Sequence, residues 1–192
     1  MTEQPPPLPP PRKSLRAAIG VLLVVGMATG YWAMCRQQVQ KQSKAVESIQ
    51  RSGGRVYLEY QWRDGAPDPQ PTPPRETLAR RLLGSDWLDR VVAVDLTTVV
   101  EMDQAIGALR WLPHLEFLNA RGSSLSDESV KSLGRITSLR SLVLAQTEIT
   151  DSSVDTLVNL RLLKHLDVQG TRISASGVKQ LRTQLPRCEV LN

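Results

Sequence analysis

Apolar residues recur at a fixed interval of 24 positions between residues 90 and 192. The repeat joins Val94, Leu118, Leu142 and Leu166, and four further sets follow it in register: Val91, Leu115, Leu139, Leu163; Leu96, Ala120, Leu144, Val168; Ile106, Val130, Val154, Val178; and Leu109, Leu133, Leu157, Leu181. Self-similarity at one fixed period predicts an array of identical structural units.

Each unit combines two hydrophobic periods. The first part reads L-x-x-L-x-L, whose last two apolar residues alternate as in a half-buried strand. The second part has helical spacing, as in Val154, Leu157 and Leu160. Between them lie pairs such as Ser126 and Asp127, residue types that accept hydrogen bonds at helix N-termini. We therefore predict one strand, one turn and one helix in every unit.

This pattern resembles the leucine-rich repeat family, in its bacterial variant L-x-x-L-x-L-x-x-T-x-I-[TS]-D-x-x-V-x-x-L. The segment LRSLVLAQTEITDSSVDTL, residues 139–157, matches it closely, and the likeness covers residues 90–192, about half of the chain. The resemblance implies an α/β fold, a short solenoid with a parallel β-sheet on its concave face and helices on its convex face. We expect four repeats and a terminal strand.

The array departs from the family pattern in two places. Where many members carry an asparagine that ladders between turns, this chain has Val99, Ser123, Thr147 and Thr171, so a hydroxyl is expected to ladder in three units. At the other end PRCEVLN, residues 186–192, repeats PHLEFLN, residues 113–119, which predicts one inserted residue near Gln184. Cys188 then fills a leucine position as a buried, reduced thiol.

Residues 17–35 carry no charged side chain. As a helix this segment would span roughly 28 Å, close to the thickness of a bilayer core. Basic residues flank it on both sides, and Tyr31 and Trp32 lie near its end, where aromatic rings favour the membrane interface. We predict a single transmembrane helix. A cleaved signal peptide and a lipid-modified Cys35 are the alternatives, but the bulky end of the segment fits neither processing site well.

The remaining N-terminal segments are expected to serve this anchor and the repeats. Residues 1–16 are proline-rich and predicted disordered, residues 36–54 form a juxtamembrane stalk helix, and residues 55–89 form a cap of one strand over 55–62, a proline-rich loop and a helix over 75–83. An N-terminus inside the cell would place the repeats on the extracytoplasmic side, although basic residues after the anchor weaken this orientation. The whole chain is similar to bacterial membrane-anchored leucine-rich repeat proteins.

Charge and composition narrow the possible functions. The formal net charge is +5, but residues 1–63 hold 9 Lys and Arg against 3 Asp and Glu, whereas residues 90–192 hold 12 against 11. A nucleic-acid-binding domain needs its positive charge on the folded part, so we expect no nucleic-acid partner. The 2 cysteines lie too far apart in sequence for a disulfide framework or a structural zinc site.

We find no catalytic constellation. His114 and His165 have no cysteine or second histidine at metal-ligand spacing, and no phosphate-binding glycine loop occurs. The recurring Asp127 and Asp151 are expected to serve the starts of their own helices, where negative charge is favoured. We therefore expect no enzyme activity, no cofactor, no metal and no small-molecule substrate.

The strands expose one column of side chains between the buried leucines. We predict protein-partner contacts on this concave face, since aromatic and arginine residues anchor interfaces. The candidates are Phe117, Asn119, Arg121, Val143, His165 and Asp167. The favoured hypothesis is a non-catalytic interaction or scaffolding module. A solvated face without a partner, a subunit of an envelope or membrane enzyme complex, and an enzyme with an unrecognised site are the alternatives.

Overall fold

The computed structural model describes residues 12–63, 65–75, 90–99 and 101–192, without the side chains of residues 12–25, 28 and 35. The chain divides into two compact units, residues 1–40 and 41–192. Helix α1 covers Arg12–Arg51. Among the residues described, no helix is long and apolar enough to span a bilayer. The predicted tail, in residues 1–11, and most side chains of the predicted anchor lie outside the description.

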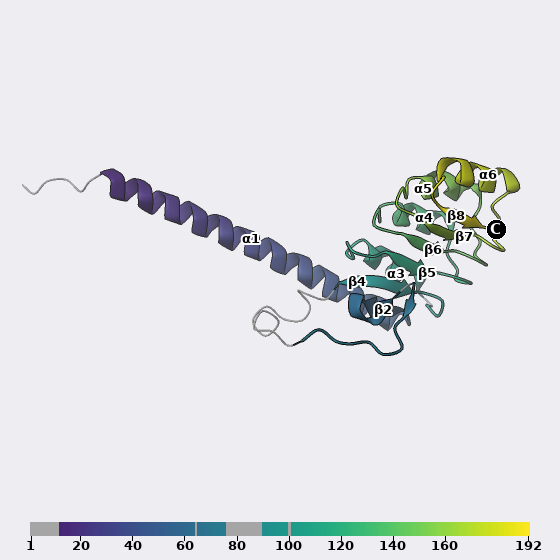
Figure 1. The fold of residues 1–192 in the computed structure, drawn as a ribbon, viewed down its shortest axis with the longest axis horizontal. Coiled ribbons are helices and arrows are strands. Elements are labelled where there is room, and N and C mark those ends of the chain that lie inside the picture. Colours follow the sequence, from purple (N-terminus) through teal and green to yellow (C-terminus); the bar gives the residue numbers. More distant parts are fainter. Residues whose placement is uncertain (1–11, 64, 76–89, 100) are drawn as a thin grey trace, which may run out of the picture. The chain divides into compact units, whose positions relative to one another are not determined.

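The second unit is built on a mixed sheet with the strand order β1-β4-β5-β6-β7-β8 (Figure 1). Its strands are β1 (Arg55–Leu58), β4 (Val91–Asp95), β5 (Phe117–Asn119), β6 (Ser141–Val143), β7 (His165–Asp167) and β8 (Glu189–Leu191). Strand β1 is antiparallel to β4, and the other neighbours are parallel. Partners in the parallel ladder are 24 residues apart, as in Leu118, Leu142 and Leu166.

Helices alternate with the strands and cover one face of the sheet (Figure 1). They are α3 (Met102–Leu109), α4 (Asp127–Leu133), α5 (Val154–Val158) after the short 3₁₀ turn η3 (Asp151–Ser153), and α6 (Ala175–Gln184). The central strand residues Leu118, Leu142 and Leu166 are 0% exposed beneath them. Each helix also buries its own apolar stripe, such as Val130 and Leu133 of α4, in the same core.

The N-terminal end of this core is covered by α1 and β1. Ala45 and Ile49 of α1 are buried in it. The helix ends before Gly53, which has φ +92°, and any side chain at Gly54 would collide with Ile49. The strand predicted over 55–62 is shorter, because Gln61 Oε1 accepts the Leu58 N–H (3.0 Å) and the chain turns.

The chain after β1 forms a 3₁₀ turn and a small hairpin. These elements are η1 (Glu59–Gln61), β2 (Trp62–Arg63) and β3 (Ala66–Pro67). Strands β2 and β3 pair antiparallel as a separate two-stranded sheet. The helix predicted over 75–83 falls on residues 76–89, which lie outside the description.

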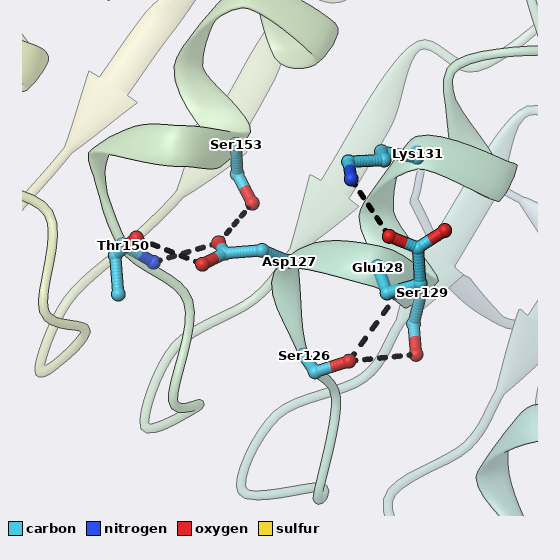
Figure 2. A network of polar contacts seen from close by, with 7 residues as sticks. All are labelled: Ser126, Asp127, Glu128, Ser129, Lys131, Thr150 and Ser153. Atoms are coloured by element: carbon cyan, nitrogen blue, oxygen red, sulfur yellow. Dashed lines mark hydrogen bonds and ion pairs between the residues drawn. The ribbon is translucent and has the colours of Figure 1, made fainter.

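Asp127 joins α4 to the following unit (Figure 2). Its carboxylate accepts the Thr150 N–H (2.9 Å) and the Thr150 hydroxyl (2.8 Å), and it also accepts the Ser153 hydroxyl. The cap of α4 itself is Ser126, whose Oγ accepts the Ser129 N–H. The expectation that Asp127 caps its own helix is therefore wrong: the carboxylate binds the next helix start.

Asp151 repeats this arrangement one unit later. Its carboxylate accepts the Ser174 N–H (2.8 Å) and the Ser174 hydroxyl (2.6 Å), whereas Thr150 Oγ1 accepts the Ser152 N–H at its own helix start. These hydrogen bonds lower the pKa of the Asp151 carboxyl. Aspartates 24 residues apart therefore connect three successive units through their loops.

The hydroxyl ladder predicted between units does not form. Ser123, Thr147 and Thr171 each donate to the backbone carbonyl three residues earlier, at 2.7, 2.6 and 2.8 Å. These carbonyls belong to the same unit, since a short hydroxyl side chain satisfies the nearest acceptor in its own turn. The three hydroxyls therefore stabilise turns within units.

The inserted residue expected near Gln184 has only a local effect. Cys188 N–H donates to Leu185 O as Leu163 N–H donates to Leu160 O, so the loop carries one extra residue. The strand nevertheless returns to the 24-residue register, because Val190 pairs with Leu166. The offset expected for this strand is therefore wrong, and Leu191 is 45% exposed instead of buried.

We predict that Leu142→Ala lowers the free energy of unfolding by about 2–5 kcal/mol, because it removes buried methyl groups and leaves a cavity. Ser141→Ala, on the opposite side of the strand, should change it by no more than about 0.5 kcal/mol. Denaturant unfolding of the full chain measures both. A larger loss for Ser141→Ala would show that the two faces of the strand are exchanged.

The Asp127 contacts predict an acid-sensitive contribution to stability. Burial disfavours the charged carboxylate, but hydrogen bonds from Ser153 and Thr150 outweigh it and hold the pKa of Asp127 below 3.8. Asp127→Ala should cost about 1–3 kcal/mol at neutral pH because it leaves the Thr150 N–H unpaired. The difference from wild type should persist above pH 3.8 and disappear as the pH falls through the lowered pKa.

Glu128→Ala is the matched control, since the exposed Glu128 pairs only with Lys131 in this network (Figure 2). Its effect should stay within about 0.5 kcal/mol. Unfolding measured from neutral to acidic pH tests both variants. Equal losses for the two variants would mean that Asp127 does not join neighbouring units.

Candidate interaction surface on the open face of the sheet

Two rows of side chains lie on the face of the sheet opposite the helices, which we call the open face. The pairings Phe117–Ser141 and Ser141–His165 form the first row, and Asn119–Val143 and Val143–Asp167 form the second. Their neighbours Leu118, Leu142 and Leu166 point to the core, and successive residues of a strand face opposite sides. Five of the predicted contact residues therefore share one face, and Arg121 follows it in a loop.

An aromatic cluster covers the N-terminal end of the open face. The Trp62 ring is tilted against Phe117, with centroids 4.6 Å apart, and against Tyr57, with centroids 5.2 Å apart. Tyr57 reaches this face because it pairs with Ala93 of β4. Phe117 is consequently half-buried within the chain instead of being freely available to a partner.

A groove of about 420 Å³ lies beside this cluster. Its walls combine aromatic, acidic and basic side chains with a small hydroxyl, contributed by the hairpin and by strands β4–β7 together with the loops before them. The lining residues are Glu59, Trp62, Gly65, Val92, Glu116, Phe117, Arg140, Ser141 and His165. Phe117 and His165 are the two predicted residues that it brings together.

The charges beside the groove are paired but exposed. Arg140 Nε lies 3.1 Å from Glu116 Oε2, and His165 Nδ1 lies 3.1 Å from Glu189 Oε2. The His165 and Glu189 side chains are 65% and 63% exposed, so solvent screens their interaction and a partner can replace it at little cost. The groove therefore offers adaptable polar groups next to an apolar wall.

The second row is largely used to turn the chain. Asn119 Oδ1 accepts the Arg121 N–H (3.2 Å), and Asp167 Oδ1 accepts the Gln169 N–H (3.0 Å). Such side-chain to backbone bonds end the strand locally. Arg121 Nε donates to Gln146 Oε1 (3.4 Å) across neighbouring loops. Asn119 and Asp167 therefore have structural roles, and Val143 is the apolar member of this row.

The arrangement does not bring titratable groups together as an active site would. Asp95 on β4 and His165 on β7 are three strands apart in the ladder, about 14 Å at the usual strand spacing. Among the residues described, no cluster of three potential metal ligands occurs. Burial raises the pKa of the Cys188 thiol to about 11, so this group stays protonated at neutral pH.

Tyr57, Trp62, Arg140 and Ser141 were not among the sequence candidates. Alternation in RVYLEYQW already placed Tyr57 on the face opposite Val56, and Ser141 occupies the same row as Phe117. No local pattern placed Trp62, because its position follows from the turn at η1 and the hairpin β2–β3. Contacts between distant segments of this kind leave no periodic signal.

Comparisons with known proteins add the following. No family model matches the chain, and no curated protein sequence matches it. Among solved structures it is similar to an internalin from Listeria monocytogenes, with 21% identity and a TM-score of 0.39 over 44% of this chain and 24% of that chain. It is also similar to actin-binding site 2 of leiomodin-1, with 14% identity and a TM-score of 0.37 over 47% of this chain and 58% of that one. The chain spans less than two thirds of either.

The ring contact between Trp62 and Phe117 predicts a measurable coupling. In a double-mutant cycle with Trp62→Ala and Phe117→Ala, the coupling energy should be about 0.5–1.5 kcal/mol, the usual value of an aromatic pair. A parallel cycle with Tyr60→Ala and Phe117→Ala should give a value near zero, since no ring contact joins them among the residues described. Equal coupling in both cycles would place the hairpin elsewhere.

Proposed function

We propose that residues 90–192 form a short leucine-rich repeat solenoid of four repeats and a terminal strand. The support is the parallel ladder, in which partners such as Ser141 and His165 are 24 residues apart. One helix follows each of the strands β4, β5, β6 and β7. The Asp127 and Asp151 contacts to the next unit fit an array in which each unit stabilises its neighbour.

We infer that the open face serves a non-catalytic role as a protein-interaction or scaffolding surface. The observation that carries this proposal is the groove between Trp62, Phe117 and His165. It joins an aromatic wall to exposed polar groups, a combination typical of interface anchors. A partner side chain entering it would contact the Trp62 ring and could replace Glu189 at His165. Val143 and Arg121 would extend the contact along the second row.

We further propose that residues 17–35 anchor the chain in a membrane as one transmembrane helix, with the repeats more favourably placed on the extracytoplasmic side. The support is the uncharged stretch of the sequence, its basic flanks and the aromatic pair Tyr31 and Trp32. Trp32 is 51% exposed and has Arg36 5.3 Å from its ring, the arrangement expected of residues at a bilayer surface.

The interaction role is tested by filling the groove. Ser141→Arg should abolish co-purification of partner proteins from detergent-solubilised membranes, because the new side chain occupies the space beside Trp62. Ser132→Arg, on the exposed side of α4, is the matched control and should retain them. Circular dichroism should show both variants folded. Retention of every partner by folded Ser141→Arg would contradict binding in the groove.

The anchor is tested by membrane extraction. The full chain should resist alkaline carbonate and be released by detergent. Val24→Arg should weaken insertion, at roughly 2.5–3.5 kcal/mol for a charge near the bilayer centre. Gln38→Arg, outside the uncharged stretch, should leave extraction unchanged. Release of the wild-type chain by carbonate would refute the anchor.

A further inference from the structure

The loops that lead from each helix to the following strand are strongly basic. These four loops are residues 110–116, 134–140, 159–164 and 185–188. Their one acidic residue is Glu116, and their six basic residues are Arg110, Arg135, Arg140, Arg161, Lys164 and Arg187. All six basic residues are exposed. The loops that lead from strand to helix are balanced, since two arginines, Arg121 and Arg172, accompany two glutamates, Glu101 and Glu148.

The four basic loops lie side by side. The Arg140 N–H donates to Glu116 O (2.7 Å), the Lys164 N–H to Arg140 O (2.7 Å), and the Glu189 N–H to Lys164 O (2.8 Å). The side chains therefore gather along one edge of the second unit, which we call the basic edge. A groove of about 310 Å³ separates its first two loops and is bordered by Arg110 and Arg135.

Structural needs of the fold leave most of this charge unexplained. The helix dipole favours cations in the last turn, but its effect falls off beyond that turn. Arg140, Lys164 and Arg187 lie within two residues of the following strand instead. Only Arg140 of the six has an acidic ion-pair partner among the residues described. The edge therefore presents positive charge that the chain itself does not neutralise.

Apolar side chains accompany the basic ones. Leu162 is 51% exposed and lies between Arg161 and the buried Leu163. In the first loop Trp111 is half-buried, with Lys41 Nζ 4.5 Å and the Arg110 guanidinium 5.3 Å from its ring. Leucine and tryptophan among lysine and arginine form the composition of surfaces that bind the boundary between lipid headgroups and acyl chains.

The attachment of the chain brings the same edge towards a membrane. Lys41, which contacts Trp111 on this edge, is the first residue of the second unit. Residues 36–40, which separate it from the uncharged segment 17–35, can span at most about 18 Å. We propose that the basic edge binds the anionic phospholipid headgroups of the membrane in which the chain is anchored. This proposal rests on the proposed anchor.

The experiment measures how close the basic edge lies to lipid in the full chain. A spin label replaces Thr137, in the second basic loop, in a chain that also carries Cys35→Ser and Cys188→Ala. A label at Ser124, in a balanced loop of the same repeat, is the control position. Each protein is placed as one copy per nanodisc of phosphatidylcholine, alone or mixed equally with phosphatidylglycerol, and collisions with a water-soluble nickel relaxer are recorded.

Anionic lipid should reduce nickel collisions at Thr137 by about twofold or more, and high salt should restore them. The label at Ser124 should not respond. Arg135→Glu with Arg161→Glu should remove the protection at Thr137, whereas Arg121→Glu with Arg172→Glu, an equal change in charge on the balanced loops, should retain it. Unchanged collisions at Thr137 in anionic discs, or equal effects of the two double variants, would overturn the proposal.

Two other outcomes also overturn it. Protection in phosphatidylcholine alone that appears only with two copies per disc would indicate binding to a second copy, whose helix starts carry Asp127, Glu128 and Asp151. Failure of the anchor is distinguished beforehand by carbonate extraction. A chain without an anchor would be tested by flotation with the same lipid mixtures, where the absence of binding to phosphatidylglycerol would refute the basic edge by itself.

Discussion

Burial of a single side chain from each short strand is the constraint on which the second unit depends. Strands β5, β6 and β7 are three residues long, and each sends only its central residue, Leu118, Leu142 or Leu166, into the core. One such unit cannot bury enough apolar surface to be stable, so each needs a neighbour on both sides. The ladder, the helix starts tied by Asp127 and the cap formed by β1 all keep these leucines stacked. The same stacking aligns Phe117, Ser141 and His165 on the open face.

The aliphatic columns could be predicted from the sequence because they recur every 24 residues and face a single core. The same regularity placed Phe117 and His165 in one row. What it missed depends on contacts between segments. The carboxylate of Asp127 acts 23 residues further along the chain, at Thr150, and Trp62 covers Phe117 only because Gln61 ends β1 early. The last strand shows a third limit, since the extra residue before Cys188 is absorbed before Val190.

Two surfaces of the second unit differ in chemistry and suit different partners. The open face has a groove with an aromatic wall and exposed polar groups, which suits side chains of a protein. The basic edge has dispersed cations and exposed Leu162, which suit a charged planar surface. If the edge rests on the membrane, the open face remains available for a partner, because the strand side chains that form it point away from the core and the loops lie at the ends of the strands. An interaction module held beside a bilayer is consistent with both.

The central claim, that the open face binds a protein, is tested most directly by photo-crosslinking in native membranes. A photoreactive amino acid replaces Ser141 in the groove, and a second chain carries it at Ser132 on the exposed side of α4. Illumination should produce one discrete protein adduct from position 141 and none from position 132, and His165→Ala should diminish it. The same adducts from both positions, or no adduct from position 141, would contradict a binding site on the open face.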